Sequence, residues 1–502
     1  MESTPSLEET KQIPNPPQKS CECKPIKKKF KCVIYDAEAR YDKNLVKCVC
    51  ERFKNFKYSN NIRVANLMWF GKHLYESDVE LCGKIKGFVN KVPGAGVFNE
   101  KQTQGRVLSQ LAKVFPEEFA FHPRSFCLPK DTDDLEEAIK ANPKKLLIAK
   151  PNEGGGGGGI FLFKSMKDLS GFTWASECVV QRYIANPLLI NNRKWDMRVY
   201  VMIHGINPMK AYLATDYGLA RFCTEDYDTS DPNNILSHLT NYSLNKNSEG
   251  YVKDQDLDEN SEENNTKISL DLVWKLIQKQ YPDVDIETDC KQKMRDIVIN
   301  VLSGMRSTIE LGYLEMTKLK SVEHNKKFYQ ILGFDIMFDD EFNGWLFEVN
   351  SYPSMDIFYH KDKSDGTYDK EKSEIDERVK STIFAEAARI LIAKDESDVF
   401  EQVYDSQEQE GLYEDVFEIY KKLSGIRLGQ SISSSKFSKL SKYLPKSLSM
   451  SQVDLEILFT KLKHSETTSI GLMGFFEGLS MISSSNSIDL SDLTSQIISN
   501  FD

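Results

Sequence analysis

Three polar residues lie in two neighbouring apolar segments that predict a β-hairpin. The segments are YQILGFDIMFD and GWLFEVNSYP, and the turn between them contains an Asn-Gly pair. Asp335 lies in the first segment, and Glu348 and Asn350 lie two residues apart in the second, so alternation places the latter two on one face. Two carboxylates and a carboxamide are costly to bury without a cation, and their hard oxygens suit Mg²⁺ held together with nucleotide phosphates. The hairpin therefore predicts a magnesium site, with solvent-facing positions on an edge strand as the alternative.

A second set of charged residues alternates along a predicted strand. Lys194, Asp196 and Arg198 occupy every other position of KWDMRVYV and so share one face of it, and Arg221 follows in GLARF. Guanidinium groups bind phosphate and carboxylate oxygens in a bidentate manner. This pattern predicts a clamp on a transferring phosphate and on acidic substrate groups. A surface ladder of salt bridges is the alternative.

Six consecutive glycines, Gly154 to Gly159, follow Lys150 and lie between two expected strands, residues 144–150 and 159–163. Glycine lets backbone N–H groups approach an anion closely, and such a loop beside a lysine is suited to cradling phosphate. A flexible low-complexity loop is the alternative. The lysine precedes the glycines and a strand follows them. This order excludes a Walker loop and a Rossmann turn, both of which open a helix.

The surrounding elements are expected to hold these residues in a β-rich lobe. Strands are predicted over residues 177–184, 197–205, 209–216 and 219–225, and helical patterns over 104–115, 131–142, 270–280, 295–310 and 374–393. A strand at 30–37, a helix at 44–53 and a strand at 63–71 predict a small α/β unit before them. The last hundred or so residues are rich in serine and have mostly helical patterns.

Composition narrows the class of protein. The chain has 502 residues, of which 40% are hydrophobic, and a formal net charge of −10, which argues against nucleic acid as the main partner because phosphate contacts need clustered Lys and Arg. No apolar run approaches the roughly 18 residues of a membrane span, and the N-terminus lacks the apolar stretch of a secretory signal. The ten cysteines are then expected to be reduced cytosolic thiols.

These features occur together in a known order. The chain resembles the tubulin tyrosine ligase-like family, a branch of the ATP-grasp ligases, over about residues 30–395. The resemblance is carried by KPNEGGGGGGI, VVQRYIANPLLINNRKWDMRVYV, YGLARFCTEDY, HLTNYSLNK, ILGFDIMFDD and LFEVNSYPS. The glycine pattern of the family is met by Lys150, Gly154, Gly157 and Gly159.

The resemblance implies a role for each matching residue. Lys150 and the upstream Lys101 would contact ATP, and Gln181, Arg182 and Ile184 would line the adenine pocket. Lys194, Asp196, Arg198 and Arg221 would hold the γ-phosphate and the substrate carboxyl groups. Thr240 and Asn241 would shape the amino-acid site, and Asp335, Glu348 and Asn350 would bind Mg²⁺.

Three positions depart from the family pattern. Lys91 stands where histidine is usual, Gln102 where aspartate usually follows the upstream lysine, and Tyr352 where serine is usual. These departures weaken the assignment of Lys101, but no core catalytic position is missing.

The resemblance implies a two-step ligation. A carboxylate attacks the γ-phosphate of ATP to give an acyl phosphate, and an amino group then displaces phosphate. HLTNYSLNK and KWDMRVYV look like the glutamylating members, which favours a tubulin polyglutamylase with free L-glutamate as second substrate. A glycyl or other amino-acid ligase and an inactive microtubule-binding scaffold are the alternatives. The expected protein is a monomer of the cytoplasm and cytoskeleton, or of the cilium, axoneme or basal body, without a nucleic-acid or membrane partner.

A second resemblance covers residues 436–479, which are similar to the tubulin polymerization-promoting protein family, an EF-hand-like helical domain. No Asp-x-Asp-x-Asp-Gly loop is present, so calcium is not expected. The fold class is therefore α/β (α+β), an ATP-grasp fold with additions at both ends. The expected division is a disordered tail (1–28), an N-terminal α/β domain (29–90), a central ATP-grasp domain (91–178), a C-terminal ATP-grasp catalytic domain (179–395) and a helical domain (396–502).

Overall fold

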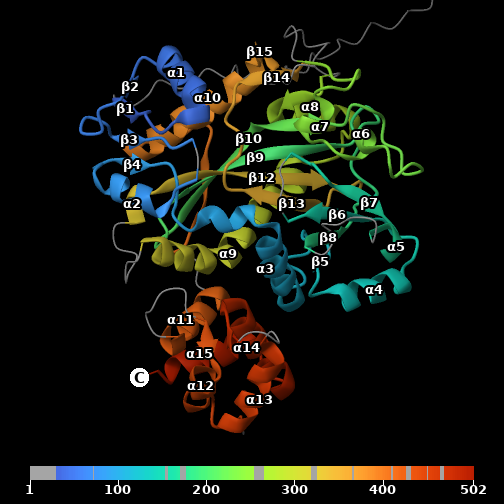
Figure 1. Ribbon diagram of the computed structural model, residues 1–502, viewed down its shortest axis with the longest axis vertical. Coiled ribbons are helices and arrows are strands. Elements are labelled where there is room, and N and C mark those ends of the chain that lie inside the picture. The colour runs from blue at the N-terminus through green and yellow to red at the C-terminus, as the bar shows by residue number, and fades with distance from the viewer. Residues whose placement is uncertain are drawn as a thin grey trace, which may run out of the picture.

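A computed structural model describes most of the chain (Figure 1). The described residues are 30–71, 73–152, 156–169, 177–253, 265–317, 325–363, 367–408, 411–424, 431–448, 450–463 and 468–501. The predicted tail, residues 1–28, lies outside them. None of the described helices is long and apolar enough to cross a membrane.

The N-terminal unit is a parallel sheet of four strands with helices against it. The strand order is β2-β1-β3-β4, from β1 (Cys32–Tyr35), β2 (Phe56–Ser59), β3 (Leu67–Met68) and β4 (Phe88–Val89). Helix α1 (Lys43–Arg52) follows β1, and α2 (Glu76–Gly83) precedes β4. The strand, helix and strand expected here are confirmed, and β2 and β4 are further strands that were not predicted.

The glycine run belongs to an antiparallel sheet of order β5-β8-β6-β7. Its strands are β5 (Ser125–Cys127), β6 (Leu147–Pro151), β7 (Phe161–Phe163) and β8 (Cys178–Arg182). Helices α3 (Lys101–Val114), α4 (Thr132–Ala141) and the short α5 (Met166–Leu169) complete this lobe. Because β6 pairs with β7 in antiparallel register, the glycines connect two strands, as predicted.

The largest sheet has six strands and carries most of the charged residues. Its order is β11-β10-β9-β12-β13, with β16 (Glu401–Asp405) paired to β10. The other strands are β9 (Trp195–His204), β10 (Lys210–Phe222), β11 (Lys267–Ser269), β12 (Tyr329–Phe338) and β13 (Gly344–Asn350). The predicted hairpin is confirmed as β12 and β13, and Asp339 stabilises its turn by accepting hydrogen bonds from the N–H groups of Glu341 and Asn343.

Two predicted strands are one in the structure. The residues expected as strands 209–216 and 219–225 form the single strand β10, whose register against β9 shifts between Leu213 and Gly218. Gly218 approaches the backbone so closely that an added Cβ would lie 2.6 Å from the carbonyl oxygen of Arg198. The absence of a side chain at residue 218 therefore permits a close strand contact beside an irregularity.

Helices cover both faces of the large sheet (Figure 1). Along β9, Met197, Val199 and Val201 belong to the apolar cluster that includes α9 (Lys293–Thr317) and α8 (Leu270–Gln280). The alternate residues Tyr200 and Met202 belong to the cluster that includes α10 (Glu374–Ala388) and α1. Alternation along the strand thus separates an apolar face from the face that also holds Asp196 and Arg198.

Several short elements complete the fold. They are α6 (Ile235–His238), α7 (Tyr242–Asn245), the hairpin of β14 (Phe358–Asp362) and β15 (Tyr368–Lys372), the single-turn segments Arg40–Asp42, Ala95–Asn99 and Asn325–Lys327, and the wider π-helical turns Ile286–Gln292 and Arg389–Ala393. The last of these extends α10 to the end of the predicted helix 374–393.

The C-terminal region is helical, as expected, and forms a lobe below α3 and α9 (Figure 1). Its elements are α11 (Leu412–Ser424), β17 (Ile432–Ser433), α12 (Ser434–Phe437), the turn Ser438–Lys442, α13 (Gln452–Leu462), β18 (Ser469–Ile470), α14 (Leu472–Asn486) and α15 (Leu490–Ser499). Its apolar side chains are continuous with the core around α9. Arg306 on α9 also bonds to Glu414 on α11, at 2.9 Å.

The domain boundaries remain predictions. The boundary placed between residues 178 and 179 falls inside β8. The boundary placed after 395 separates β16 from the sheet to which it pairs. Because β8 pairs with β5 and β6, strand pairing favours boundaries after β8 and after β16.

Candidate functional site

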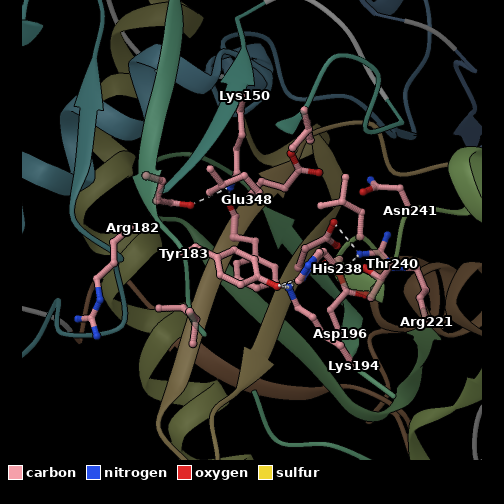
Figure 2. A pocket seen from close by; sticks show the side chains of 17 residues that line it. Lys150, Arg182, Tyr183, Lys194, Asp196, Arg221, His238, Thr240, Asn241 and Glu348 are labelled. Carbon is pink, nitrogen blue, oxygen red and sulfur yellow. Dashed lines mark hydrogen bonds and ion pairs between the residues drawn. The ribbon is translucent and has the colours of Figure 1, made fainter. Parts of the chain in front are cut away.

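A cavity of about 650 Å³, a volume that includes space open to solvent, lies between the glycine-bearing sheet and the large sheet. Figure 2 shows the side chains that line it, which come from β6, β8, β9, β10, β12, β13 and the segment around α6. Eleven of the residues predicted from the sequence line this cavity: Lys150, Gln181, Arg182, Ile184, Lys194, Asp196, Arg221, Thr240, Asn241, Asp335 and Glu348.

Strand register aligns the charged residues across the large sheet. Arg221 on β10 is opposite Asp196 on β9, and Arg198 on β9 is opposite Asp335 on β12. Asp335 is in turn opposite Glu348 on β13. Directly opposed residues share a face of the sheet. These five side chains therefore lie together on one face and are called here the charged row.

The carboxylates of the row are held by its guanidinium groups. Arg221 donates two hydrogen bonds to Asp196, at 2.8 and 2.6 Å, and lies 3.0 Å from Asp335. Arg198 donates to both oxygens of Asp335, at 2.9 Å from Nη2. Burial would raise the pKa of Asp335, but these two guanidinium groups lower it to about 2.

Two lysines enter the cavity from outside the row. Lys194 donates to the Tyr183 hydroxyl at 3.1 Å and to the His238 carbonyl at 2.9 Å. Lys150 donates to Gln181 Oε1 at 2.8 Å and to the Phe347 carbonyl at 3.4 Å. Burial lowers the pKa of each lysine to about 8. Together with Arg198 and Arg221 they place four cations against three carboxylates, an excess that suits a polyanionic ligand.

The described part of the glycine loop lies against the segment that carries Thr240 and Asn241. Gly157 has a φ of +86°, and an added Cβ would lie 2.9 Å from the Asn241 side chain. Ser243 donates a short hydrogen bond to the Gly156 carbonyl. Gly159 also has a positive φ, +75°, whereas Gly154 lies outside the described residues. Glycine is therefore needed at residue 157 for both its backbone angle and its lack of a side chain.

Asn245 fixes the segment that carries Thr240 and Asn241. Its buried side chain donates to the Leu239 carbonyl at 2.7 Å and to the Asn241 carbonyl at 3.0 Å. It also accepts from the Thr224 N–H at 3.2 Å. These bonds hold Thr240 and Asn241 in a non-helical segment between α6 and α7.

Apart from the glycines, three of the predicted residues are not part of the cavity lining. Lys101 begins α3 and lines an adjoining smaller cavity, which it shares with Lys150 and Glu348. Asn350 donates to Glu348 Oε1 at 3.1 Å. Arg198 does not line the cavity itself but bonds to Asp335, which does. Arg182 lines the cavity, but its guanidinium points away from the charged cluster (Figure 2) and lies 5.9 Å from the Trp345 ring.

The side-chain oxygens of the predicted metal ligands are of the chemical type that binds a divalent cation. Asp335, Glu348 and Asn350 offer oxygen ligands from facing positions of β12 and β13, as Mg²⁺ prefers. Asp335 is already paired with two guanidinium groups, so Glu348 and Asn350 are the members of the set without such pairing. Among the described residues, no cluster of three or more His, Cys, Asp and Glu side chains has the geometry of a metal site. The magnesium assignment stays a prediction.

The sequence reading missed several residues of the site. Tyr183, His238 and Phe347 line the cavity, and the Tyr183 hydroxyl lies 2.9 Å from His238 Nδ1. Each is adjacent or close in sequence to a predicted residue, which was the available signal. Their role depends on contacts with Lys194, which no local pattern reveals.

Comparison with known proteins agrees with this geometry. Residues 81–364 match the model of the Tubulin-tyrosine ligase family. Similar proteins include Tubulin polyglutamylase TTLL11 of Mus musculus, 32% identical over 352 residues that cover 68% of this chain and 46% of the relative. Tubulin polyglutamylase TTLL6 of Mus musculus is 32% identical over 294 residues, 58% of this chain and 34% of the relative. Tubulin polyglutamylase ttll-11 of Caenorhabditis elegans is 34% identical over 285 residues, 53% of this chain and 38% of the relative.

The chain thus spans less than half the length of these relatives. The family match, in contrast, covers more than half of this chain. It includes the glycine loop, the charged row and the hairpin of β12 and β13. The chain belongs to the tubulin-tyrosine ligase family.

Proposed function

We propose that this protein is an ATP-dependent ligase that adds glutamate to carboxylates of tubulin tails. The observation that carries the proposal is the charged row with Lys150 and Lys194 in one cavity, on a chain whose relatives are named tubulin polyglutamylases. The reaction joins a carboxylate to an amine, and ATP takes up the departing oxygen as phosphate. Both the nucleotide and the two amino-acid groups are anionic, which agrees with the excess of cations.

The residues of the cavity divide naturally between the two ends of such a reaction. Lys150, held by Gln181, would bind phosphate oxygens beneath the glycine loop. Arg221 and Arg198 would stabilise negative charge that develops during transfer, because they are already oriented by Asp196 and Asp335 and need little reorganisation. Thr240 and Asn241 would contact the incoming glutamate.

Lys194 would hold its charge near the transferring group. Its ammonium is fixed by the Tyr183 hydroxyl and the His238 carbonyl. With a pKa of about 8, roughly nine-tenths of it is protonated at pH 7. Mg²⁺ bound by Glu348, Asn350 and Asp335 would neutralise further phosphate charge.

Relatives named polyglutamylases favour glutamate over the alternative amino acids. The inactive-scaffold alternative is disfavoured because the matching lysines, arginines and Glu348 are all present and most line one cavity. We infer a cytoskeletal location from the same relatives. A ciliary or axonemal site, a monomeric state and the use of free L-glutamate belong to the proposal.

We also propose that residues 411–501 form an EF-hand-like module that binds a partner on the microtubule. In support, α11, β17 and α12 and then α13, β18 and α14 repeat one order of elements, and β17 pairs with β18 in antiparallel register. Val453 and Ile457 on α13 are more than half exposed, at 62% and 54%. The resemblance of residues 436–479 to the tubulin polymerization-promoting protein family suggests that this partner is tubulin or a microtubule protein.

Mass spectrometry tests the enzymatic proposal directly. The purified protein is incubated with tubulin, ATP and Mg²⁺, and with glutamate, glycine or tyrosine in separate reactions. Tails that gain the mass of whole glutamyl residues, only when glutamate and ATP are present, support the proposal. A gain only with another amino acid replaces glutamate, and no gain with any amino acid overturns the ligase function.

A further inference from the structure

The strand that carries Glu348 and Asn350 is an edge strand. β13 is the last strand in the order of the large sheet and pairs with β12 on one side. Backbone groups on the outer side of such a strand need partners of another kind. Here side chains supply them: Lys150 binds the Phe347 carbonyl at 3.4 Å, and Asn99 accepts from the Ser351 N–H at 2.9 Å.

Between these two contacts, Gln104 on α3 binds both backbone groups of Val349. Its Oε1 accepts from the Val349 N–H at 2.9 Å, and its Nε2 donates to the Val349 carbonyl at 3.1 Å. Nε2 also donates to the Phe98 carbonyl at 2.6 Å. The side-chain amide thus takes the place that a neighbouring strand would occupy.

Val349 is the residue between the two predicted metal ligands. Because side chains alternate along a strand, its own side chain is buried on the face opposite to Glu348 and Asn350. Fixing the Val349 peptide groups fixes the direction of both neighbouring side chains. Gln104 is itself only 6% exposed, so its amide has little freedom to move away.

We propose that Gln104 is a positioning residue that sets the orientation of Glu348 and Asn350 toward the metal and nucleotide. The proposal rests on the proposed function for the presence of a metal–nucleotide complex in this cavity. An amide is required, since only it offers a donor and an acceptor at the spacing of a peptide group. Outer partners of metal ligands typically change metal affinity or activity by about 10- to 100-fold when they are removed.

Gln102 provides a matched control on the same helix. It lies two residues before Gln104 and is also partly buried, and its Nε2 donates to the Leu128 carbonyl at 2.9 Å. Replacing either glutamine with methionine keeps the length of the side chain and the helix propensity, and it removes one side-chain amide. Of these two described glutamines, Gln104 bonds to β13, whereas the bond of Gln102 is to Leu128.

The test uses the full chain and Mn²⁺ as the probe. Binding of Mn²⁺ is measured by electron paramagnetic resonance at saturating non-hydrolysable ATP analogue, and amide hydrogen exchange is followed in a peptide covering β13. For Gln104→Met we expect about 10- to 100-fold weaker Mn²⁺ binding, faster exchange at β13, a matching fall in kcat and an unchanged KM for glutamate. For Gln102→Met we expect Mn²⁺ affinity close to that of the unaltered protein.

Several outcomes would overturn the proposal. They are an unchanged Mn²⁺ affinity in Gln104→Met, or an equal loss in both methionine variants. If Gln104→Met does not fold, Gln104→Asn, which keeps the amide but is one methylene shorter, must show weakened Mn²⁺ binding, and normal binding there also overturns it. Absence of Mn²⁺–nucleotide binding by the unaltered protein overturns the positioning role. Binding without glutamylation of tubulin removes the proposed function and leaves the role of Gln104 supported or refuted by the variants alone.

Discussion

Two aspartates in this protein are similarly buried and are each held by two cations, but they differ in their access to a ligand. Asp335 on β12 is 3% exposed and is held by Arg198 and Arg221. Asp376 on α10 is 2% exposed and is held by Lys267 at 2.6 Å and Lys380 at 2.8 Å. Burial would raise the pKa of each, and in each the paired cations lower it.

The difference lies in what surrounds each set of charges. Asp335 lines the cavity of the candidate site. Asp376 is not among the residues of that cavity, and its partner Lys267 lies over the rings of Tyr242 and Tyr359, at 5.1 and 4.8 Å. Lys380 also donates to the Asp356 carbonyl. A buried charge cluster therefore indicates a site only when a cavity reaches it. The Asp376 cluster ties α10 to neighbouring elements, whereas the Asp335 cluster is open to substrate.

The largest effect is expected at Glu348, the carboxylate of the cavity without a guanidinium partner. Glu348→Gln keeps the shape of the side chain and removes its charge, so ligation should fall by about 10³-fold or more, roughly 4 kcal/mol of transition-state stabilisation. The rate of glutamate addition to tubulin measures it. Glu341→Gln, in the exposed turn of the same hairpin, is the control. A Glu348→Gln variant with more than a tenth of normal activity would contradict the assignment.

The next effect concerns stability, at the closed cluster. Asp376→Asn leaves two buried ammonium groups without their carboxylate, and should lower the free energy of unfolding by about 3 kcal/mol. Because the pKa of Asp376 is below its ordinary value in the folded state, its contribution is present above about pH 4 and is lost as pH falls below that value. Denaturant unfolding between pH 7 and pH 3 should therefore show a flatter profile in the variant. The kcat of the folded variant should stay within about twofold, since Asp376 does not line the cavity.

Replacing an arginine of the charged row with lysine tests whether the geometry of the guanidinium group matters as well as its charge. Arg221→Lys retains the charge but loses the two parallel bonds to Asp196 and the third contact with Asp335. Activity should fall by about 10²-fold, as followed in the same tubulin assay. Arg193, which lies 4.9 Å from the Phe222 ring, supplies the control variant Arg193→Lys. Equal losses in the two variants would show that the effect is not specific to the charged row.

The smallest effect is a pH dependence of nucleotide binding. Burial lowers the pKa of Lys150 and Lys194 to about 8, so both lose their protons between pH 7 and pH 9, well below the range of an exposed lysine. Affinity for an ATP analogue should fall by roughly tenfold for each lysine that must be protonated. Isothermal titration measures it, and Lys150→Arg should flatten the profile because arginine stays charged. A profile that is flat in the unaltered protein would refute the role of both lysines.

Features that depend on residues close together in the chain could be predicted from the sequence, and features that depend on distant residues could not. The pairing of Asp335 with Glu348 was predictable because a tight turn and strict alternation fix both residues locally. The same alternation placed Asp196 and Arg198 on one face. The pairing of β16 with β10, close to 190 residues earlier in the chain, was not predictable, because a five-residue strand has no local signal of its partner.

Residues that act through others were the ones missed. Gln104 reads as an ordinary position of an amphipathic helix, and its bonds to Val349 join residues 245 apart in sequence. Tyr183 reads as a strand residue until Lys194 is found beside it. Side chains that position a site depend on the tertiary structure alone, whereas residues that contact a ligand also leave a recurring pattern of types and spacing.

The packing of the C-terminal lobe has a practical consequence for work with this protein. Phe115, which follows α3, lies 6.5 Å from Phe476 on α14, and Leu423 and Phe475 belong to the same apolar cluster as Val301 and Met305 on α9. A chain shortened after Asp405 would leave this part of α3 and α9 in water, and aggregation is the expected result. Because α3 also begins at Lys101 and carries Gln104, loss of activity in such a shortened chain would report damage to the ligand cavity as readily as loss of microtubule docking. Point substitutions on the outer face of α13, at Val453 and Ile457, are the cleaner way to test the proposed docking alone.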